Sequence, residues 1–153
     1  MSRIIEQSIF IDAPVDAVWR VVTEPDQIRN WFADELDLRV EPGRQGTMTF
    51  GTDPADQHHV QVSVEAVEPA RSYSYRWSHP AGSTARAGNS TLVEFTLVPE
   101  GGGTRLRVTE SGLDETTWPD DEKDTFEQDH LHGWEVHLRR LAEVVTRGAP
   151  APR

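Results

Sequence analysis

Three side chains of this 153-residue sequence could carry acid–base chemistry, and Glu110 is the first of them. Glu110 follows Val108 by two residues in a period-two strand pattern, so its carboxylate is expected on the interior side of that strand. A carboxylate buried there would have a raised pKa or an arginine partner. Because charged side chains are rarely buried without a partner, exposure at the end of the strand is the favoured interpretation.

His130 and Tyr75 are the other two acid–base candidates. His130 lies four residues before Trp134, on a stripe of apolar residues with helical spacing. An imidazole at that place could act as a general base or donate a hydrogen bond to a ligand. The favoured alternative is a core histidine with a backbone partner, because buried polar groups are nearly always hydrogen-bonded.

The spacing of the histidines does not indicate a metal site. His58 and His59 are adjacent, so a strand would place them on opposite faces. His130 and His132 point apart on a helix, whereas His130 and His137 share a face but lie ~10 Å apart along its axis. The chain has no cysteine, which removes disulfides and thiolate ligands. We therefore expect neither a metal ion nor a cofactor.

A set of mostly aromatic residues predicts an apolar cavity. Ligand pockets are usually apolar with a few well-placed polar groups, which matches this set. The alternative has equal weight: these residues simply fill a core, as aromatic side chains commonly do. The candidate ligand-binding residues are Trp31, Phe32, Phe50, Tyr73, Tyr75, Trp77, Phe95, His130, Trp134 and Leu138.

These side chains must be positioned by short strands followed by one long helix. Alternating patterns predict strands at residues 3–12, 36–40, 48–50, 58–66, 73–77, 92–97 and 105–109. Helical spacing predicts short helices at 14–22 and 25–32 and a long helix at 120–147. The strands form an antiparallel meander with one aromatic face, and the long helix should cover that face.

Composition and charge limit the classes of function. Hydrophobic residues make up 36% of the chain and charged residues 27%, as in an ordinary globular domain, so residues 1–153 are expected to form one domain with a frayed tail at 147–153. The net charge is −11, and residues 110–129 hold nine acids against Lys123 alone. Acidic side chains at the start of a helix interact favourably with the helix dipole, which explains this acidic segment. The alternative is that it forms an acidic docking patch. Nucleic acid is not an expected partner, because phosphate binding needs a basic face.

No apolar run approaches the ~20 residues of a membrane-spanning helix, so membrane insertion is not expected. The first residues, MSRIIEQSIFI, lack the long apolar core of a signal peptide. A cytoplasmic protein is therefore the expectation.

Several short motifs occur in a recognisable order: I-x-A-P at 11–14, VW at 18–19, EPDQIRNWF at 24–32, and GW at 133–134 followed by Leu138 and Leu141. This order resembles the START-like helix-grip superfamily, also called SRPBCC. Within it, the chain is similar to the family of the activator of the ninety-kilodalton heat-shock-protein ATPase, in its C-terminal-type domain only, over about residues 3–146. The resemblance implies an α+β fold in which a curved antiparallel sheet of about six or seven strands wraps around the C-terminal helix, with two short helices after the first strand.

The resemblance also implies a cavity between sheet and helix that binds a small hydrophobic ligand: a lipid, a polyketide or another aromatic molecule. Binding without catalysis is the favoured function. The alternative is an enzyme of the cyclase, aromatase or hydratase type that uses the same cavity, with His130, Glu110 or Tyr75 as its acid–base group. A weaker alternative is a chaperone-associated interaction protein. Homodimerisation through a sheet face or edge is left open.

Overall fold

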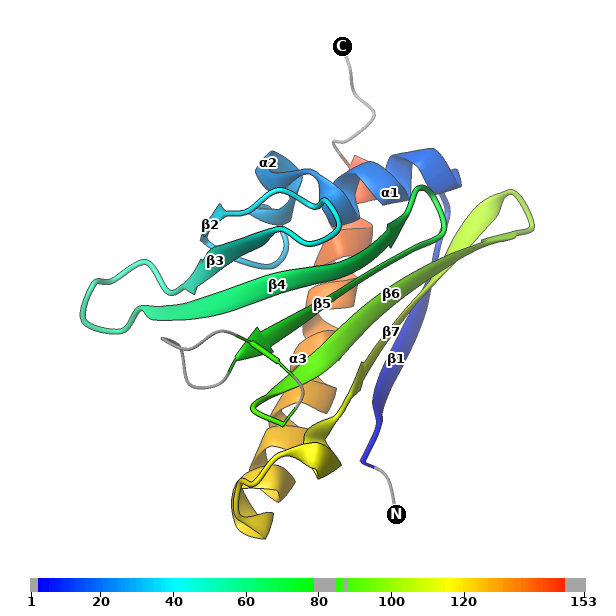
Figure 1. The fold of residues 1–153 in the computed structure, drawn as a ribbon. Coiled ribbons are helices and arrows are strands. Elements are labelled where there is room, and N and C mark those ends of the chain that lie inside the picture. Colours follow the sequence, from blue (N-terminus) through cyan, green and yellow to red (C-terminus); the bar gives the residue numbers. More distant parts are fainter. Residues whose placement is uncertain (1–2, 79–84, 87, 148–153) are drawn as a thin grey trace.

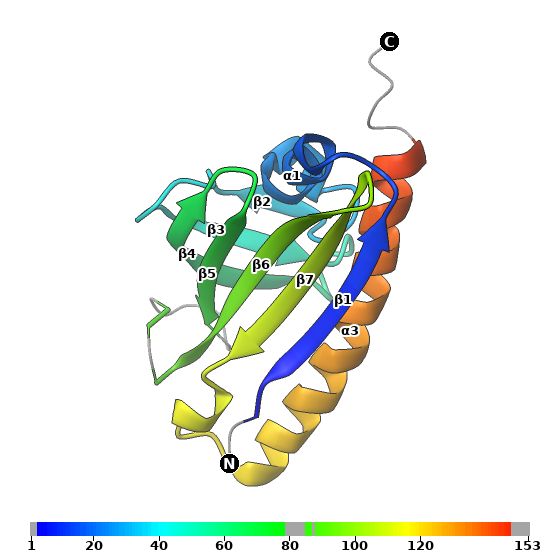
Figure 2. The same ribbon diagram turned by 90° about the vertical axis from the view of Figure 1, so that its right-hand side faces the viewer.

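A curved antiparallel sheet of seven strands forms most of the fold, and one long helix runs along it (Figures 1 and 2). The computed structural model describes residues 3–78, 85–86 and 88–147. The strands are β1 (Ile5–Ile11), β2 (Glu35–Asp37), β3 (Gln45–Phe50), β4 (His58–Glu68), β5 (Ser72–Ser78), β6 (Ser90–Glu100) and β7 (Gly103–Ser111). Their order across the sheet is β1-β7-β6-β5-β4-β3-β2. The expected α+β helix-grip architecture is confirmed.

Within the described residues, three α-helices and one short 3-10 helix accompany the sheet. They are α1 (Val15–Thr23), α2 (Pro25–Ile28), η1 (Leu113–Glu115) and α3 (Asp120–Arg147). The long helix has the bounds that its apolar spacing predicts. Its buried residues fall on a single stripe and are Phe126, Trp134, Leu138, Leu141 and Val145. Of all the strands, α3 runs closest to β1 (Figure 2).

The second short helix ends four residues earlier than its sequence pattern predicts, at Ile28 instead of residue 32. The chain turns there and brings the next aromatic side chain, Trp31, against α1. Trp31 donates a hydrogen bond from Nε1 to the carbonyl of Val21 at 2.8 Å, and both Trp31 and Phe32 are buried. Tertiary packing therefore outweighs the helical spacing of these residues.

Strand register brings the interior side chains of the middle strands into rows across the sheet. Tyr75 pairs with Val93, and Val93 pairs with Glu110 on the next strand. Trp77 pairs with Thr91 one row further toward the end of β5. Side chains from three consecutive strands therefore meet on the face toward α3.

Two sequence-based expectations need comment. The strand expected at 36–40 is regular only over Glu35–Asp37. Parts of the loop expected after residue 78, namely 79–84 and 87, and all but the first residue of the expected tail, 148–153, lie outside the described residues.

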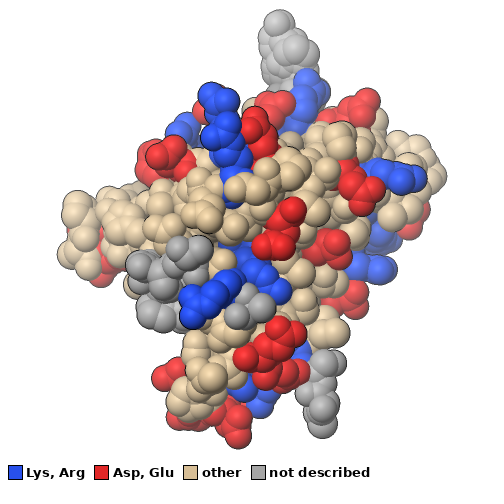
Figure 3. All heavy atoms as spheres, in the orientation of Figure 1, with Lys and Arg blue, Asp and Glu red and all other residues tan. Residues whose placement is uncertain are grey.

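Acidic side chains gather at the end of the molecule where α3 begins (Figure 3). Arg3 partly balances them: its guanidinium lies 2.6 Å from Asp124 and 3.2 Å from Glu127, and its backbone N–H donates to Asp114. These contacts tie the start of β1 to the first turns of α3. Over the described residues, the protein has no helix that combines the length and the apolar character needed to cross a membrane.

Candidate functional site

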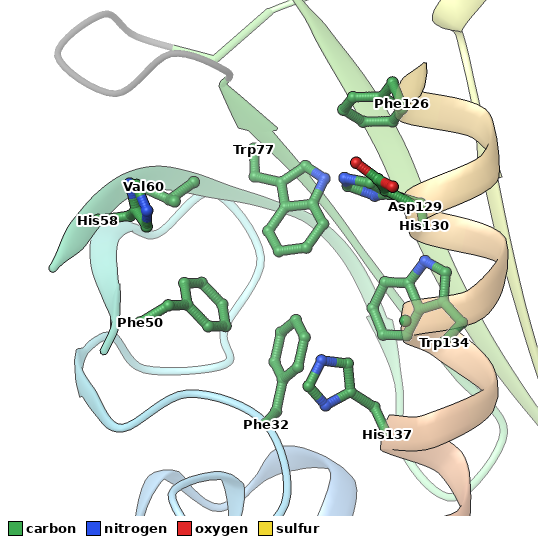
Figure 4. A pocket seen from close by; sticks show the side chains of 11 residues that line it. Phe32, Phe50, His58, Val60, Trp77, Phe126, Asp129, His130, Trp134 and His137 are labelled. Carbon is green, nitrogen blue, oxygen red and sulfur yellow. The ribbon is translucent and has the colours of Figure 1, made fainter. Parts of the chain in front are cut away.

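A cavity of about 320 Å³ lies between α3 and the strands β3, β4 and β5. Figure 4 shows side chains from both walls pointing toward one another across it. Its walls are mainly aromatic and imidazole rings. The lining residues are Phe32, Phe50, His58, Val60, Trp77, Phe126, Asp129, His130, Gly133, Trp134 and His137.

The helical wall follows from the spacing of residues on α3. His130, Gly133, Trp134 and His137 are separated by three, one and three residues, which places them on one face of the helix. Gly133 is the gap in this wall, because a Cβ atom built there would meet nothing within 4 Å. A glycine inside a helix costs up to about 1 kcal/mol relative to alanine. The helix therefore carries a local weakness at the point where a side chain would enter the cavity.

A buried carboxylate stands directly behind this cavity. Oε1 of Glu110 accepts hydrogen bonds from Nδ1 of His130 at 2.8 Å and from Nε1 of Trp134 at 2.9 Å. Oε2 accepts from Oγ1 of Thr91 at 2.6 Å and from Nε1 of Trp77 at 3.0 Å. We call these five residues the carboxylate cluster. Three of its members, Trp77, His130 and Trp134, also line the cavity.

The expectation that Glu110 would be exposed at a strand end is wrong, because its side chain is 0% exposed. Its partners are not arginines but two indoles, a hydroxyl and an imidazole. Burial by itself opposes ionisation. The hydrogen bond and charge of His130, with the hydrogen bonds from Thr91 and Trp134, outweigh it and lower the pKa of Glu110 below the usual value. Glu110 is therefore a buried carboxylate that is ionised at neutral pH.

The carboxylate fixes the orientation and tautomer of the His130 ring. An ionised carboxylate only accepts hydrogen bonds, so Nδ1 of His130 carries a proton and Nε2 is the remaining ring nitrogen. The ring stacks on Phe126 with a centroid distance of 3.6 Å, and its side chain is 26% exposed. The expected backbone partner for His130 is wrong, since its partner is a carboxylate.

His137 occupies the opposite end of the same helical wall. Its Nδ1 lies 3.2 Å from the backbone carbonyl of Trp31, so that nitrogen also carries the proton. Burial lowers the pKa of His137, although the hydrogen bond to Trp31 acts in the other direction. The ring meets Phe32 edge-on with a centroid distance of 5.0 Å. His137 is thus a largely neutral imidazole in an aromatic setting.

The structure divides the ten sequence-predicted ligand-binding residues into two groups. Five line the cavity: Phe32, Phe50, Trp77, His130 and Trp134. The other five lie buried in the packed core: Trp31, Tyr73, Tyr75, Phe95 and Leu138. Sequence reasoning missed six lining residues, which are His58, Val60, Phe126, Asp129, Gly133 and His137. The positions of His137 and Gly133 on the Trp134 face of the helix could have indicated two of them.

The two tyrosines are set apart from the cavity by burial. Their hydroxyl oxygens have no hydrogen-bond partner among the described residues. Burial raises the pKa of Tyr73 and of Tyr75 well above the usual value, and for Tyr75 the nearby Glu110 adds to the shift. Tyr75, the third acid–base candidate, therefore remains a neutral phenol that does not line the cavity.

A second hollow of about 500 Å³ adjoins the cavity, with Phe126, Asp129 and His130 lining both, and lies against the acidic first turns of α3. Asp121, Glu122 and Asp129 are among its lining residues. Within the described part of the chain, no three His, Asp or Glu side chains converge as ligands for a metal ion.

Comparisons with known proteins place this geometry in a family. The model of the family "Activator of Hsp90 ATPase homolog 1-like protein" matches residues 12–146. No curated protein sequence matches the chain.

Several solved structures share the fold. Protein MLL2253 from Mesorhizobium loti is 24% identical with a TM-score of 0.77, and the match covers 95% of this chain and 98% of the other. DynU16, a protein in the dynemicin biosynthetic locus, is 26% identical with a TM-score of 0.74, and the match covers 97% of this chain but 49% of the other. The Aha1 dimer from Colwellia psychrerythraea is 19% identical with a TM-score of 0.73, and the match covers 95% and 97%. Because the family model spans most of the sequence and the helix-grip fold agrees with it, the chain belongs to the Activator of Hsp90 ATPase homolog 1-like family.

Proposed function

We propose that this protein binds a small aromatic or otherwise apolar molecule in the cavity between α3 and strands β3–β5. The observation that carries the proposal is a cavity of about 320 Å³ whose wall is built from facing aromatic rings and interrupted by a glycine. Ligand pockets usually measure roughly 300–1,000 Å³, so the volume suits a compact ligand of a few rings. A lipid, a polyketide or another aromatic or hydrophobic molecule fits this chemistry.

The rings of the cavity wall support a flat ligand in particular. Phe32 stacks on Trp134 with a centroid distance of 5.3 Å, and Trp77 stacks on Trp134 at 6.0 Å. Phe50 meets Phe32 edge-on at 5.1 Å. A planar molecule can take up the same offset and edge-on contacts with these rings. The likeness to DynU16, which lies in a biosynthetic locus, is consistent with a small organic molecule as the ligand.

Gly133 offers the experiment that tests the proposal. Gly133→Leu places a branched side chain into the cavity without displacing any atom near Cβ, and Gly133→Ala adds only a methyl group at the same point. Native mass spectrometry of protein purified from its own host should show a bound mass on the wild type and on Gly133→Ala. The mass should be lost from Gly133→Leu. Equal occupancy of all three proteins would place the ligand elsewhere and overturn the proposal.

Catalysis in the same cavity is the second candidate, because the hydrogen bond between His130 and Glu110 gives this wall an oriented acid–base group. A cyclase-, aromatase- or hydratase-type reaction would use Nε2 of His130 to move a proton. His130→Asn removes Nε2, while its amide N–H can still donate to Glu110. If the protein is an enzyme, this variant should carry a different compound from the wild type, because unreacted substrate accumulates. If the protein only binds, both should carry the same compound.

A further inference from the structure

We propose that the ligand carries an acidic hydroxyl group, as in a phenol or an enol, and that this hydroxyl forms a hydrogen bond with Nε2 of His130. The inference rests on the proposed binding function and names the chemistry of the ligand. It starts from His130. Among the described residues that line the cavity, His130 is the only one whose imidazole nitrogen contacts the buried carboxylate of Glu110.

The direction of Nε2 follows from the geometry of the ring. Nδ1 of His130 points at Glu110, whose side chain is 0% exposed, at a distance of 2.8 Å. The two nitrogens of an imidazole point to different sides of the ring, so Nε2 turns away from the buried carboxylate. His130 lines the cavity, and Figure 4 shows it reaching from α3 toward Trp77. Nε2 is therefore the polar atom that the carboxylate cluster presents to a ligand.

A hydroxyl suits Nε2 in both protonation states of the ring. With Nδ1 protonated, Nε2 of the neutral ring accepts a hydrogen bond, which a phenol O–H donates. If the proton moves to Nε2, the ring becomes an imidazolium that donates to the phenolate oxygen. The negative charge of Glu110 stands on the other side of the ring and balances that imidazolium. A carbonyl oxygen would suit the charged ring only, and an ammonium group would suit the neutral ring only.

The charges around the site favour a ligand with a neutral hydroxyl group over a ligand with a carboxylate. Asp129 neighbours His130 on α3 and lines the cavity, while Asp121 and Glu122 line the adjoining hollow. The remaining titratable groups on the cavity wall are His58 on β4 and His137 on α3. A permanently charged carboxylate ligand would meet these acids on its way in. A phenol approaches as a neutral molecule, because an ordinary phenol has a pKa of about 10.

The wall supplies two aromatic rings that contact the His130 ring. Trp77 meets the His130 ring edge-on with a centroid distance of 5.8 Å, and Phe126 stacks on the ring's face. The ring of a bound phenol can therefore pack against Trp77 while its oxygen meets Nε2. His137 also lines the cavity, but it has a carbonyl behind it and not a carboxylate. The hydroxyl is therefore assigned to the His130 end.

Three probes of nearly equal shape test the proposal: naphthalene, 2-naphthol and 2-methoxynaphthalene. The last keeps the oxygen and lacks the proton. Affinities are measured by tryptophan fluorescence and calorimetry on the whole protein, for the wild type, His130→Asn and His137→Asn. Both variants can keep the hydrogen bond that Nδ1 makes and both remove Nε2, so they form a matched pair on one helix face. Circular dichroism and thermal unfolding verify that each variant is folded.

We expect the wild type to bind 2-naphthol roughly tenfold or more tightly than either other probe, as one hydrogen bond to a charge-assisted partner allows. His130→Asn should abolish this preference and still bind naphthalene, whereas His137→Asn should keep it. Equal affinities for all three probes in the wild type, or loss of the preference only in His137→Asn, would overturn the hydroxyl assignment and leave the binding function intact. Failure of the wild type to bind any of the three would count against the binding function itself and remove the basis of this inference.

Discussion

Two histidines on one face of α3 differ in what stands behind them. His130 and His137 both line the cavity, and in both rings Nδ1 is tied to an oxygen. For His130 the oxygen belongs to the buried, ionised carboxylate of Glu110, and for His137 it belongs to the carbonyl of Trp31. The same side chain on the same helix therefore has a charge behind it at one end of the cavity and a neutral dipole at the other. Environment, more than residue type or spacing, sets the role that each imidazole can play.

Removal of the charge should have the largest effect. Glu110→Ala leaves the two indole N–H groups, a hydroxyl and His130 without their acceptor, in a place that water does not reach. We expect a loss of about 3–5 kcal/mol in the free energy of unfolding, measured by urea titration. His137→Ala, which removes one bond to a carbonyl, should cost clearly less. If the two losses are equal, the carboxylate cluster is not the stronger anchor.

The two buried indoles provide a matched pair for the same comparison. Trp134 donates to the Glu110 carboxylate at 2.9 Å, and Trp31 donates to the Val21 carbonyl at 2.8 Å. Charge-assisted hydrogen bonds are roughly twice as strong as neutral ones, so we expect Trp134→Phe to lose ~2 kcal/mol of hydrogen-bond free energy and Trp31→Phe ~1 kcal/mol. Urea unfolding of both variants measures the difference. A larger loss for Trp31→Phe would contradict the assigned charge on Glu110.

Glu110 and His137 should also change the stability of the protein in different pH windows. The pKa of Glu110 is lowered from 4.5, so its contribution to stability is present above pH 4.5 and is lost as the pH falls through the folded-state pKa. The pKa of His137 is lowered from 6.5, so the unfolded chain takes up protons first and stability falls as the pH drops below 6.5. Urea unfolding across pH 3–8, with Glu110→Gln and His137→Asn, should remove each window separately. If the loss of stability in one pH window persists after the residue assigned to it is replaced, another titratable group causes that loss.

The smallest expected effect on stability is that of a methyl group added to the cavity wall at Gly133. Gly133→Ala should stabilise the fold by about 0.5–1 kcal/mol, because alanine favours a helix over glycine and its methyl group meets no atom within 4 Å. Thermal unfolding should therefore show a raised midpoint. A lowered midpoint would mean that the space beside Gly133 is filled in solution.

The sequence is sufficient to predict the fold but only half of the site. Apolar spacing gives α3 with its observed bounds, and alternation places Glu110 on the interior side of β7. It does not show that Thr91 and Trp77, from two other strands, meet the same carboxylate. Those contacts depend on strand register across β5, β6 and β7 and on the height of α3 above the sheet. Neither quantity is encoded in local spacing, which is why Glu110 was expected to be exposed.

The aromatic residues show the same limit. Tyr73, Tyr75 and Trp77 alternate on one strand and have the same pattern in the sequence. Only Trp77, nearest the end of β5, lines the cavity, while both tyrosines lie in the core. Periodicity identifies the face on which a side chain lies. It does not give the depth at which packing stops and the cavity begins.

The most direct test is nitrogen-15 NMR of the histidine rings, recorded with and without 2-naphthol. We expect both His130 and His137 to show a protonated Nδ1 in the free protein, as their hydrogen bonds require. On addition of 2-naphthol, the Nε2 resonance of His130 should move strongly and that of His137 only slightly. A response confined to His137, or no response at either ring while naphthol binds, would contradict the claim that Glu110 orients His130 toward the ligand.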